Sequence, residues 1–199
     1  MAGEELHEKG AEGARRAKVW LERTTRVEAR WVVPDRVAVP KLTFSWVKPN
    51  IDPFSFDIGG LLSGGDLEGE QFVAESKFYD NPGNQGTMYR EFLAKCYCAL
   101  IDRPSVCDHF FWITWAPFLV ESWKELTSEE FVAKAVTKHC EKALNCEPSE
   151  AADALDDTLV KEVSERLWII VLSKRQEQHL VMSQQHLALI RQHETEKGA

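Results

Sequence analysis

Residues 53–79 read PFSFDIGGLLSGGDLEGEQFVAESKFY, and this stretch decides the fold. Two runs rich in strand-forming residues, 53–62 and 71–79, flank a polar connector with three glycines. Such a pattern predicts an antiparallel hairpin, although the connector is longer than the tightest two-residue turns. We therefore expect this hairpin to lie at the centre of the protein.

The hairpin register predicts which side chains meet. If the turn centres on Asp66, Asp57 lies opposite Glu75 on the partner strand. Side chains alternate between the two faces of a strand, so Lys77 lies on the same face as Glu75. The alternate positions from Phe72 to Phe78 are mostly apolar and suit a buried face. Two carboxylates and one lysine are thus expected to converge on one face of the hairpin.

This combination of side chains suits metal-dependent cleavage of a phosphodiester bond. Two carboxylates can hold a hard cation such as Mg²⁺, which prefers oxygen ligands and keeps several of its waters. The metal polarises the phosphate and activates a bound water. A neighbouring lysine orients that water and offsets charge that develops on the phosphate.

Asp57, followed eighteen residues later by Glu75-Ser76-Lys77, resembles the core motif of the PD-(D/E)xK nuclease superfamily. The resemblance implies a restriction endonuclease-like fold and a Mg²⁺- or Mn²⁺-dependent endonuclease that cuts DNA. It makes Asp57, Glu75 and the backbone carbonyl of Ser76 the metal ligands, and Lys77 the catalytic lysine. One departure is Phe56, which stands where the motif has proline.

Two further features resemble the family. Members often carry a glutamate on the helix before the core sheet, and Glu12 or Glu22 fits that position. Many have a glutamine at the start of the helix after the ExK strand, where Gln85 stands. Asp66 competes with Asp57 as the first carboxylate, but an aspartate is expected in a glycine-rich turn for turn geometry alone. We therefore favour Asp57.

The rest of the chain predicts a mixture of helices and strands. A helix is expected over 4–30, and strand-like runs over 37–39, 41–47 and 110–115. Further helices are expected over 88–101, 121–145, 150–164 and 174–197, while the apolar run 167–172 fits a strand or a buried helical turn. Trp20, Trp46, Trp112 and Trp168 are expected in the core. The predicted fold class is α/β, with a central mixed sheet flanked by helices.

No long linker or internal repeat divides the chain, so we expect a single domain over 1–199. The nuclease-like core spans about 10–118, and about 119–199 forms a mainly helical extension.

The charge is unevenly distributed along the 199 residues. The net charge is −8, yet residues 1–50 hold ten Lys and Arg against seven Asp and Glu. An acidic body with one basic flank is compatible with phosphate contacts on one face. Arg15, Arg16 and Lys18 are the candidates for contacts to the backbone of DNA, or of RNA. A solvated surface helix explains the same residues without any ligand.

Composition excludes several other classes of protein. The longest apolar run, Leu167 to Leu172, is too short to span a membrane. Five cysteines without a secreted spacing favour the reducing cytoplasm. His139, Cys140 and Cys146 match no usual zinc spacing, and buried or incidental thiols are favoured there.

Two function classes stay open on the sequence. The first is an active nuclease in restriction, phage defence or repair, with a homodimer compatible with cutting both strands. The second is a catalytically silent or partner-dependent subunit of the same fold that binds nucleic acid or assembles a larger complex. The intact Asp57, Glu75 and Lys77 favour the first class, and the net charge of −8 favours the second.

Overall fold

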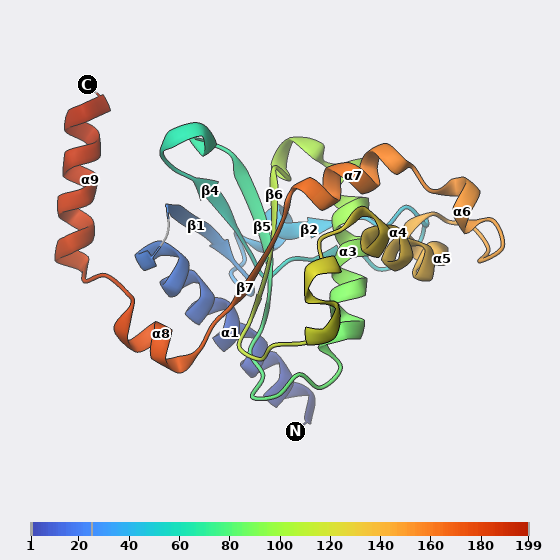
Figure 1. Ribbon diagram of the computed structural model, residues 1–199, viewed down its shortest axis with the longest axis horizontal. Helices are drawn as coiled ribbons and strands as arrows, with labels where there is room; N and C mark the ends of the chain where they lie inside the picture. The colour runs from blue at the N-terminus through green and yellow to red at the C-terminus, as the bar shows by residue number, and fades with distance from the viewer. Residues whose placement is uncertain (1, 25, 199) are drawn as a thin grey trace.

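A mixed five-stranded sheet forms the centre of the protein in the computed structural model, which describes residues 2–24 and 26–198 (Figure 1). The strands are arranged in the order β1 (Val27–Val32), β4 (Ile58–Leu62), β5 (Gln71–Lys77), β6 (His109–Thr114) and β7 (Leu167–Val171). The pairs β1–β4 and β4–β5 are antiparallel, whereas β5–β6 and β6–β7 are parallel. The expected α/β class with a mixed sheet is confirmed.

Helices cover both faces of this sheet and create two apolar layers. On one face, α1 (Ala2–Thr24) buries Ala14, Ala17 and Leu21 against residues of β4, β5 and β6. On the other face, α3 (Gln85–Asp102) packs with α4 (Glu129–Lys138) and α7 (Asp157–Glu165) over Val73, Phe110 and Trp112. Figure 1 shows α1 and α3 on opposite sides of the strands.

The remaining elements are short and connect these layers, except for the last helix. They are α2 (Val39–Leu42), β2 (Thr43–Phe44), β3 (Phe54–Ser55), the 3₁₀ turns η1 (Gly65–Leu67), η2 (Pro104–Val106) and η3 (Val120–Glu125), and the helices α5 (Cys140–Ala143), α6 (Ala151–Ala154), α8 (Lys174–His179) and α9 (Gln184–Gly198). Figure 1 shows α9 projecting from the body beyond α8.

In the part of the chain that the structure describes, no helix combines the length and apolar character needed to cross a lipid bilayer.

The predicted hairpin register is confirmed. Ile58 pairs with Ala74 and Gly60 with Phe72, as a turn centred on Asp66 requires. The turn itself is η1, with Gly64 and Gly65 at positive φ. Glycine has no Cβ and adopts this conformation without strain. The run of Phe72, Val73 and Ala74 is buried on both faces, because helices cover both sides of the sheet.

Five sequence predictions about local structure are wrong. The helix expected over 4–30 ends at Thr24, and Val27–Val32 forms the strand β1, in which buried Val27 and Ala29 alternate with exposed Glu28 and Arg30. Pairing with β4 therefore outweighs local helix propensity. The strand-like runs expected over 37–39 and 41–47 are interrupted by the helical turn α2, and only Thr43–Phe44 forms a strand there. Pro40 occupies a first-turn position of α2 that suits proline.

The third concerns residues 121–145, which divide into η3, α4 and α5 instead of one helix. The helices expected over 150–164 and 174–197 are also divided, into α6 and α7 and into α8 and α9. Ser128 caps α4 by accepting from the backbone N–H of Phe131, so the helix begins after it.

The C-terminal part contributes to the sheet as well as adding helices. The run that fits either a strand or a helical turn is the strand β7, which pairs with β6 at the sheet edge. The expectation that Trp168 belongs to the core is wrong, since its side chain is 44% exposed. An edge strand has a neighbour on one side only, and Trp168 lines a surface cavity beside Leu21, Phe111 and Ile170. Trp112 and Trp46 are buried as expected.

Candidate active site

Asp57 lies directly before β4, where the hairpin register places it beside the end of β5. Its backbone N–H donates to the carbonyl of Ala74 at 2.9 Å. Its side-chain Oδ2 accepts from the backbone N–H of Ser76 at 2.8 Å and from the Ser76 hydroxyl at 3.2 Å. These contacts hold the Asp57 carboxylate against the last residues of β5.

Glu75 and Lys77 form an ion pair on the face of β5 that α3 covers. Lys77 Nζ donates to Glu75 Oε1 at 2.6 Å. Lys95 Nζ, from α3, lies 3.8 Å from the same oxygen. The other oxygen, Glu75 Oε2, is buried and has no hydrogen-bond partner among the described residues. A buried carboxylate oxygen without a partner is costly, so this atom points to a ligand-binding role.

The charges of these side chains act on one another. Burial raises the pKa of Asp57 to about 6, and the negative charge of Glu75 adds to the rise, while Lys77 and the Ser76 N–H oppose it. Burial lowers the pKa of Lys77, but the charges of Glu75 and Asp57 outweigh this effect and raise it above the ordinary value. Lys77 is therefore a permanent cation, and Asp57 is a carboxylate that would gain from a further positive charge nearby.

A small cavity of about 120 Å³ opens between the start of α1 and the end of β5. Its lining consists of Lys9, Gly10, Asp57, Ser76, Lys77, Phe78 and Tyr79. The helix approaches closely here, because a Cβ added at Gly13 would lie 2.8 Å from the Cβ of Phe78. Asp57 and Lys77 therefore reach one shared cavity, whereas Glu75 is not among the residues that line it.

The residues present fit a hard divalent cation. Asp57 and Glu75 supply carboxylate oxygens, and the partnerless Glu75 Oε2 is a donor atom that a cation would satisfy. Among the described residues no group of three or more His, Cys, Asp or Glu side chains is placed to hold a metal. Two carboxylates with backbone oxygen and water suit Mg²⁺ or Mn²⁺ better than a metal that needs a full set of protein ligands.

Gln85 begins α3, as expected, but its side chain is turned into the protein. The residue is fully buried, and its Oε1 accepts from the Thr114 hydroxyl at 2.6 Å. Thr114 pairs in register with Lys77 across β5 and β6. Gln85 thus supports the end of β5 that carries Lys77 through its hydrogen bond with Thr114 on the neighbouring strand. It does not line the cavity beside Asp57.

The two candidate glutamates on α1 lie apart from the other site residues. Glu12 is exposed and pairs with Arg15 at 3.1 Å. Glu22 pairs with Lys18 at 3.0 Å. Neither glutamate is among the residues that line the cavity beside Asp57. The structure therefore brings together Asp57, Glu75, Ser76 and Lys77, and leaves Glu12 and Glu22 outside this group.

The three basic residues of α1 that are candidates for contacts to a nucleic-acid backbone, Arg15, Arg16 and Lys18, each have a carboxylate partner. Arg15 and Lys18 pair with the two glutamates just described, and Arg16 donates to Glu177 of α8. A cation that already has a carboxylate partner is a weaker candidate for a phosphate contact, because binding has to break the existing pair.

Sequence reasoning missed Lys95 as a member of the site. Its neighbours Leu93, Ala94 and Cys96 are all completely buried. A lysine inside such a run needs a buried carboxylate partner, and Glu75 supplies it. The run of apolar residues around Lys95 was the available signal.

Comparisons with known proteins identify no family. No protein-family model matches the sequence, and no curated protein matches it. Among solved structures, the chain is similar to a Moraxella osloensis Cap4 SAVED/CARF-domain containing receptor, with 9% sequence identity and a TM-score of 0.34. The match covers 84% of this chain and 33% of the receptor, so the chain spans about a third of that protein's length. A similarity this weak supports no conclusion about fold or function.

Proposed function

We propose that this protein is a metal-dependent endonuclease that hydrolyses phosphodiester bonds of DNA. The observation that carries the proposal is the joint position of Asp57, Glu75 and Lys77, where β4 begins and β5 ends. One carboxylate and the lysine line a common cavity, and the second carboxylate keeps a buried oxygen that has no hydrogen-bond partner among the residues the structure describes. The α/β sheet with its central hairpin is compatible with a restriction endonuclease-like core, which is part of the same proposal.

Each residue has a definite role in this reaction. Asp57 and Glu75 bind the cation, with the backbone carbonyl of Ser76 as a further ligand. When bound, Mg²⁺ or Mn²⁺ supplies a Lewis acid that polarises the phosphate and lowers the pKa of a water. Lys77 stays protonated, so it donates to the attacking water and offsets charge on the phosphate.

The supporting residues keep this arrangement in place. Lys95 neutralises Glu75 in the absence of substrate, which lowers the cost of burying that carboxylate. The Ser76 N–H and hydroxyl orient Asp57. Thr114 and Gln85 fix the neighbouring end of β6 through their hydrogen bond. The positions of the reactive groups therefore depend on regular strands instead of on a flexible loop.

A specific observation favours the second candidate, a catalytically silent subunit of the same fold. Two ammonium groups, those of Lys77 and Lys95, already neutralise Glu75 Oε1. In a silent member this ion cluster would be purely structural, and the protein would bind nucleic acid or assemble a complex. Partner-dependent activity belongs to this candidate too.

The deciding experiment measures cleavage of plasmid and of single-stranded DNA with Mg²⁺ or Mn²⁺. The parent is compared with Glu75→Gln, Asp57→Asn and Lys77→Ala, and with Asp66→Asn as the matched control. Asp66 is an exposed acid in the turn η1, at the far end of the same hairpin. We expect the three site variants to lose at least a hundredfold in rate with unchanged circular dichroism, and Asp66→Asn to cut like the parent.

Other outcomes separate the candidates. Cutting that survives all three site substitutions contradicts the proposed site. A parent that does not cut but binds Mg²⁺ in calorimetry, with binding lost in Asp57→Asn, favours a partner-dependent nuclease. A parent that neither cuts nor binds metal favours the silent subunit.

Substrate and setting follow from the same proposal. DNA is the proposed substrate, and RNA is tested beside it. The proposed biology is restriction, phage defence or repair. The protein would act there as a homodimer or as a subunit of a larger complex. All five cysteines are free thiols, four of them buried, which agrees with the proposed cytoplasmic setting.

A further inference from the structure

A second cavity, of about 350 Å³, adjoins the one beside Asp57. Phe78 and Tyr79 line both cavities, so the two are immediate neighbours. We call the second cavity the α8 groove. The residues that define it here are Phe78, Tyr79, Asp80, Trp115, Lys174 and Arg175. The groove thus joins the end of β5 to the first turn of α8, far along the chain.

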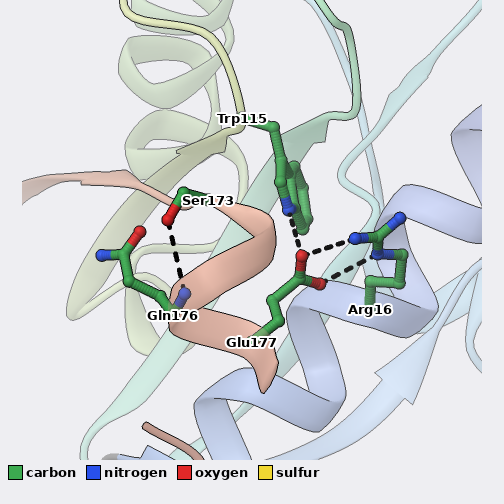
Figure 2. Close-up of polar contacts among 5 residues, drawn as sticks. All are labelled: Arg16, Trp115, Ser173, Gln176 and Glu177. Carbon is green, nitrogen blue, oxygen red and sulfur yellow. Dashed lines mark hydrogen bonds and ion pairs between the residues drawn. The ribbon is translucent and has the colours of Figure 1, made fainter. Parts of the chain in front are cut away.

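A half-buried carboxylate fixes α8 against this end of the sheet. Glu177 accepts from Arg16 Nε at 2.9 Å and from Trp115 Nε1 at 2.9 Å (Figure 2). Its side chain is only 15% exposed. Ser173 caps the helix by accepting from the backbone N–H of Gln176. The first turn of α8 therefore has a defined position relative to Phe78 and Tyr79.

The first turn of α8 carries two cations, Lys174 and Arg175, and the charge of Lys174 helps to lower the pKa of Glu177. Lys174 and Arg175 are exposed, and neither forms an ion pair with a residue that the structure describes. Positive charge is unfavourable in the first turn of a helix, where the helix dipole is itself positive. Asp80 is the one acid among the residues lining the groove, so the lining keeps a net positive charge. This contrasts with the paired cations of α1.

Tyr79 contributes an aromatic ring to the lining of the groove. The neighbouring Phe78 is engaged, with the Arg16 guanidinium 4.2 Å from its ring centroid and the Trp115 ring packed against it at 5.2 Å. Tyr79 is half-buried and packs against no other ring in the described part of the chain. A half-buried ring that lines the groove beside two exposed cations matches the requirements of single-stranded nucleic acid, which needs a stacking surface for a base and positive charge for its phosphates.

We infer that the α8 groove binds a single-stranded segment of the nucleic acid next to the bond that is cut. A base stacks on Tyr79, and Lys174 and Arg175 contact the adjacent backbone phosphates. This inference rests on the proposed function, because it assigns the groove to the same substrate. The C-terminal segment is then part of the substrate-binding surface and not only an appendage to the core.

The test measures binding separately from cleavage. A fluorescent single-stranded oligonucleotide of about 12 nucleotides is titrated in EDTA, where metal-dependent cutting is blocked. The Lys174→Ala/Arg175→Ala variant is compared with Lys138→Ala/Lys161→Ala, which removes two exposed cations from α4 and α7. We expect the first variant to bind about tenfold more weakly than the parent. We also expect its affinity to fall less steeply with salt, with the slope of log affinity against log salt smaller in magnitude by about 1.4, or about 0.7 for each cation. The control binds like the parent.

Tyr79 provides a second, independent readout. Tyr79→Ala is expected to weaken binding at least fivefold, and Tyr79→Phe is expected to bind like the parent because the ring is kept. A blunt duplex of the same sequence should be affected less than the single strand. An equal loss on the duplex overturns the single-strand assignment.

The two proposals fail in distinguishable ways. If the parent cuts DNA and the Lys174→Ala/Arg175→Ala variant binds and cuts like the parent, the groove inference is overturned and the nuclease stands. If binding depends on Lys174, Arg175 and Tyr79 but the parent never cuts, the nuclease proposal fails and the groove is supported. A parent that does not bind the oligonucleotide overturns the groove inference directly.

Discussion

Lys77 and Glu75, two residues apart on β5, form an ion pair of 2.6 Å inside the protein, and their side chains are only 18% and 8% exposed. Pairs this well buried behave differently from surface salt bridges, because removing one partner leaves the other charge without compensation. The second lysine, Lys95, is 3.8 Å from the same oxygen and compensates only in part.

The first prediction concerns this difference between the two lysines. Lys77→Met is expected to lower the free energy of unfolding by about 2–4 kcal/mol, because Glu75 keeps only the more distant ammonium. Lys95→Met is expected to cost about half as much. Urea unfolding at neutral pH in EDTA measures both values. Equal losses in the two variants would show that the 2.6 Å contact has no special weight.

The second prediction concerns Asp57, whose pKa of about 6 lies above the ordinary value of 3.8. Between these two values the folded state holds more protons than the unfolded state, so stability falls as pH rises. The stabilising contribution is complete below the ordinary pKa and is lost as pH passes about 6. Without divalent metal, Asp57→Asn is therefore expected to be more stable than the parent at neutral pH by about 1–3 kcal/mol.

The asparagine keeps an oxygen that can accept from the Ser76 N–H, so the substitution removes mainly the charge. Added Mg²⁺ should raise the melting temperature of the parent and leave that of Asp57→Asn unchanged. Thermal unfolding from about pH 4 to pH 8, with EDTA and with Mg²⁺, measures both effects. A variant less stable than the parent at neutral pH in EDTA contradicts this account.

These site residues were accessible to sequence reasoning because their relation is local. Apolar alternation in 72–78 and the turn at Asp66 set the register, and the register alone places Asp57 beside Glu75. The strand β1 was missed because Glu28 and Arg30 continue the charged pattern of α1, and the signal that makes it a strand is its pairing with β4. The local sequence of residues 27–32 does not predict that pairing.

Long-range contacts explain the other omissions. Lys95 joins Glu75 only because α3 packs back on β5. Glu177 meets Arg16 across 161 positions of sequence, and no periodicity encodes such a contact. Secondary structure near a well-patterned hairpin can thus be predicted from the sequence. The site residues that other elements contribute can be identified only once the packing of those elements is known.

The third prediction uses two glycines of α1 as a matched pair. A methyl group at Gly13 would lie 2.8 Å from Phe78 Cβ, while a methyl group at Gly10 meets nothing within 4 Å. Alanine is the better helix former by about 1 kcal/mol, so Gly10→Ala is expected to stabilise the protein by up to that amount. Gly13→Ala is expected to destabilise it by about 1–3 kcal/mol, because α1 has to move away from β5.

The same pair tests whether the packing of α1 matters for the reaction. Gly13 lies over Ser76 and Phe78, beside the cavity that Asp57 and Lys77 share. Under the proposed function, Gly13→Ala is expected to reduce the cleavage rate about tenfold or more, whereas Gly10→Ala changes the cavity lining itself and serves as the control for stability alone. Urea unfolding and the plasmid assay provide the measurements. A Gly13→Ala protein as stable and active as the parent would show that the helix moves freely at this contact.

The last prediction concerns the contact that holds α8. Arg16 and Glu177 are 27% and 15% exposed, and Glu177 also accepts from Trp115, so this pair should be stronger than a solvated one. A double-mutant cycle with Arg16→Met and Glu177→Gln is expected to give a coupling free energy of about 1 kcal/mol. The same cycle on Lys134 and Glu130, which pair on α4 at 72% and 79% exposure, is expected to show no measurable coupling.

Acid should release the same contact. Burial raises the pKa of Glu177, but the hydrogen bonds from Arg16 and Trp115 outweigh it and lower the pKa below the ordinary value. The pair therefore stabilises α8 above the ordinary glutamate pKa and loses this effect as pH falls through the lower folded value. Hydrogen exchange in residues 174–180 should then increase in acid and in Glu177→Gln at neutral pH, while exchange in β5 stays slow. If exchange in α8 is unchanged by the substitution, the helix is held by its apolar contacts, and Glu177 does not set the position of Lys174 and Arg175.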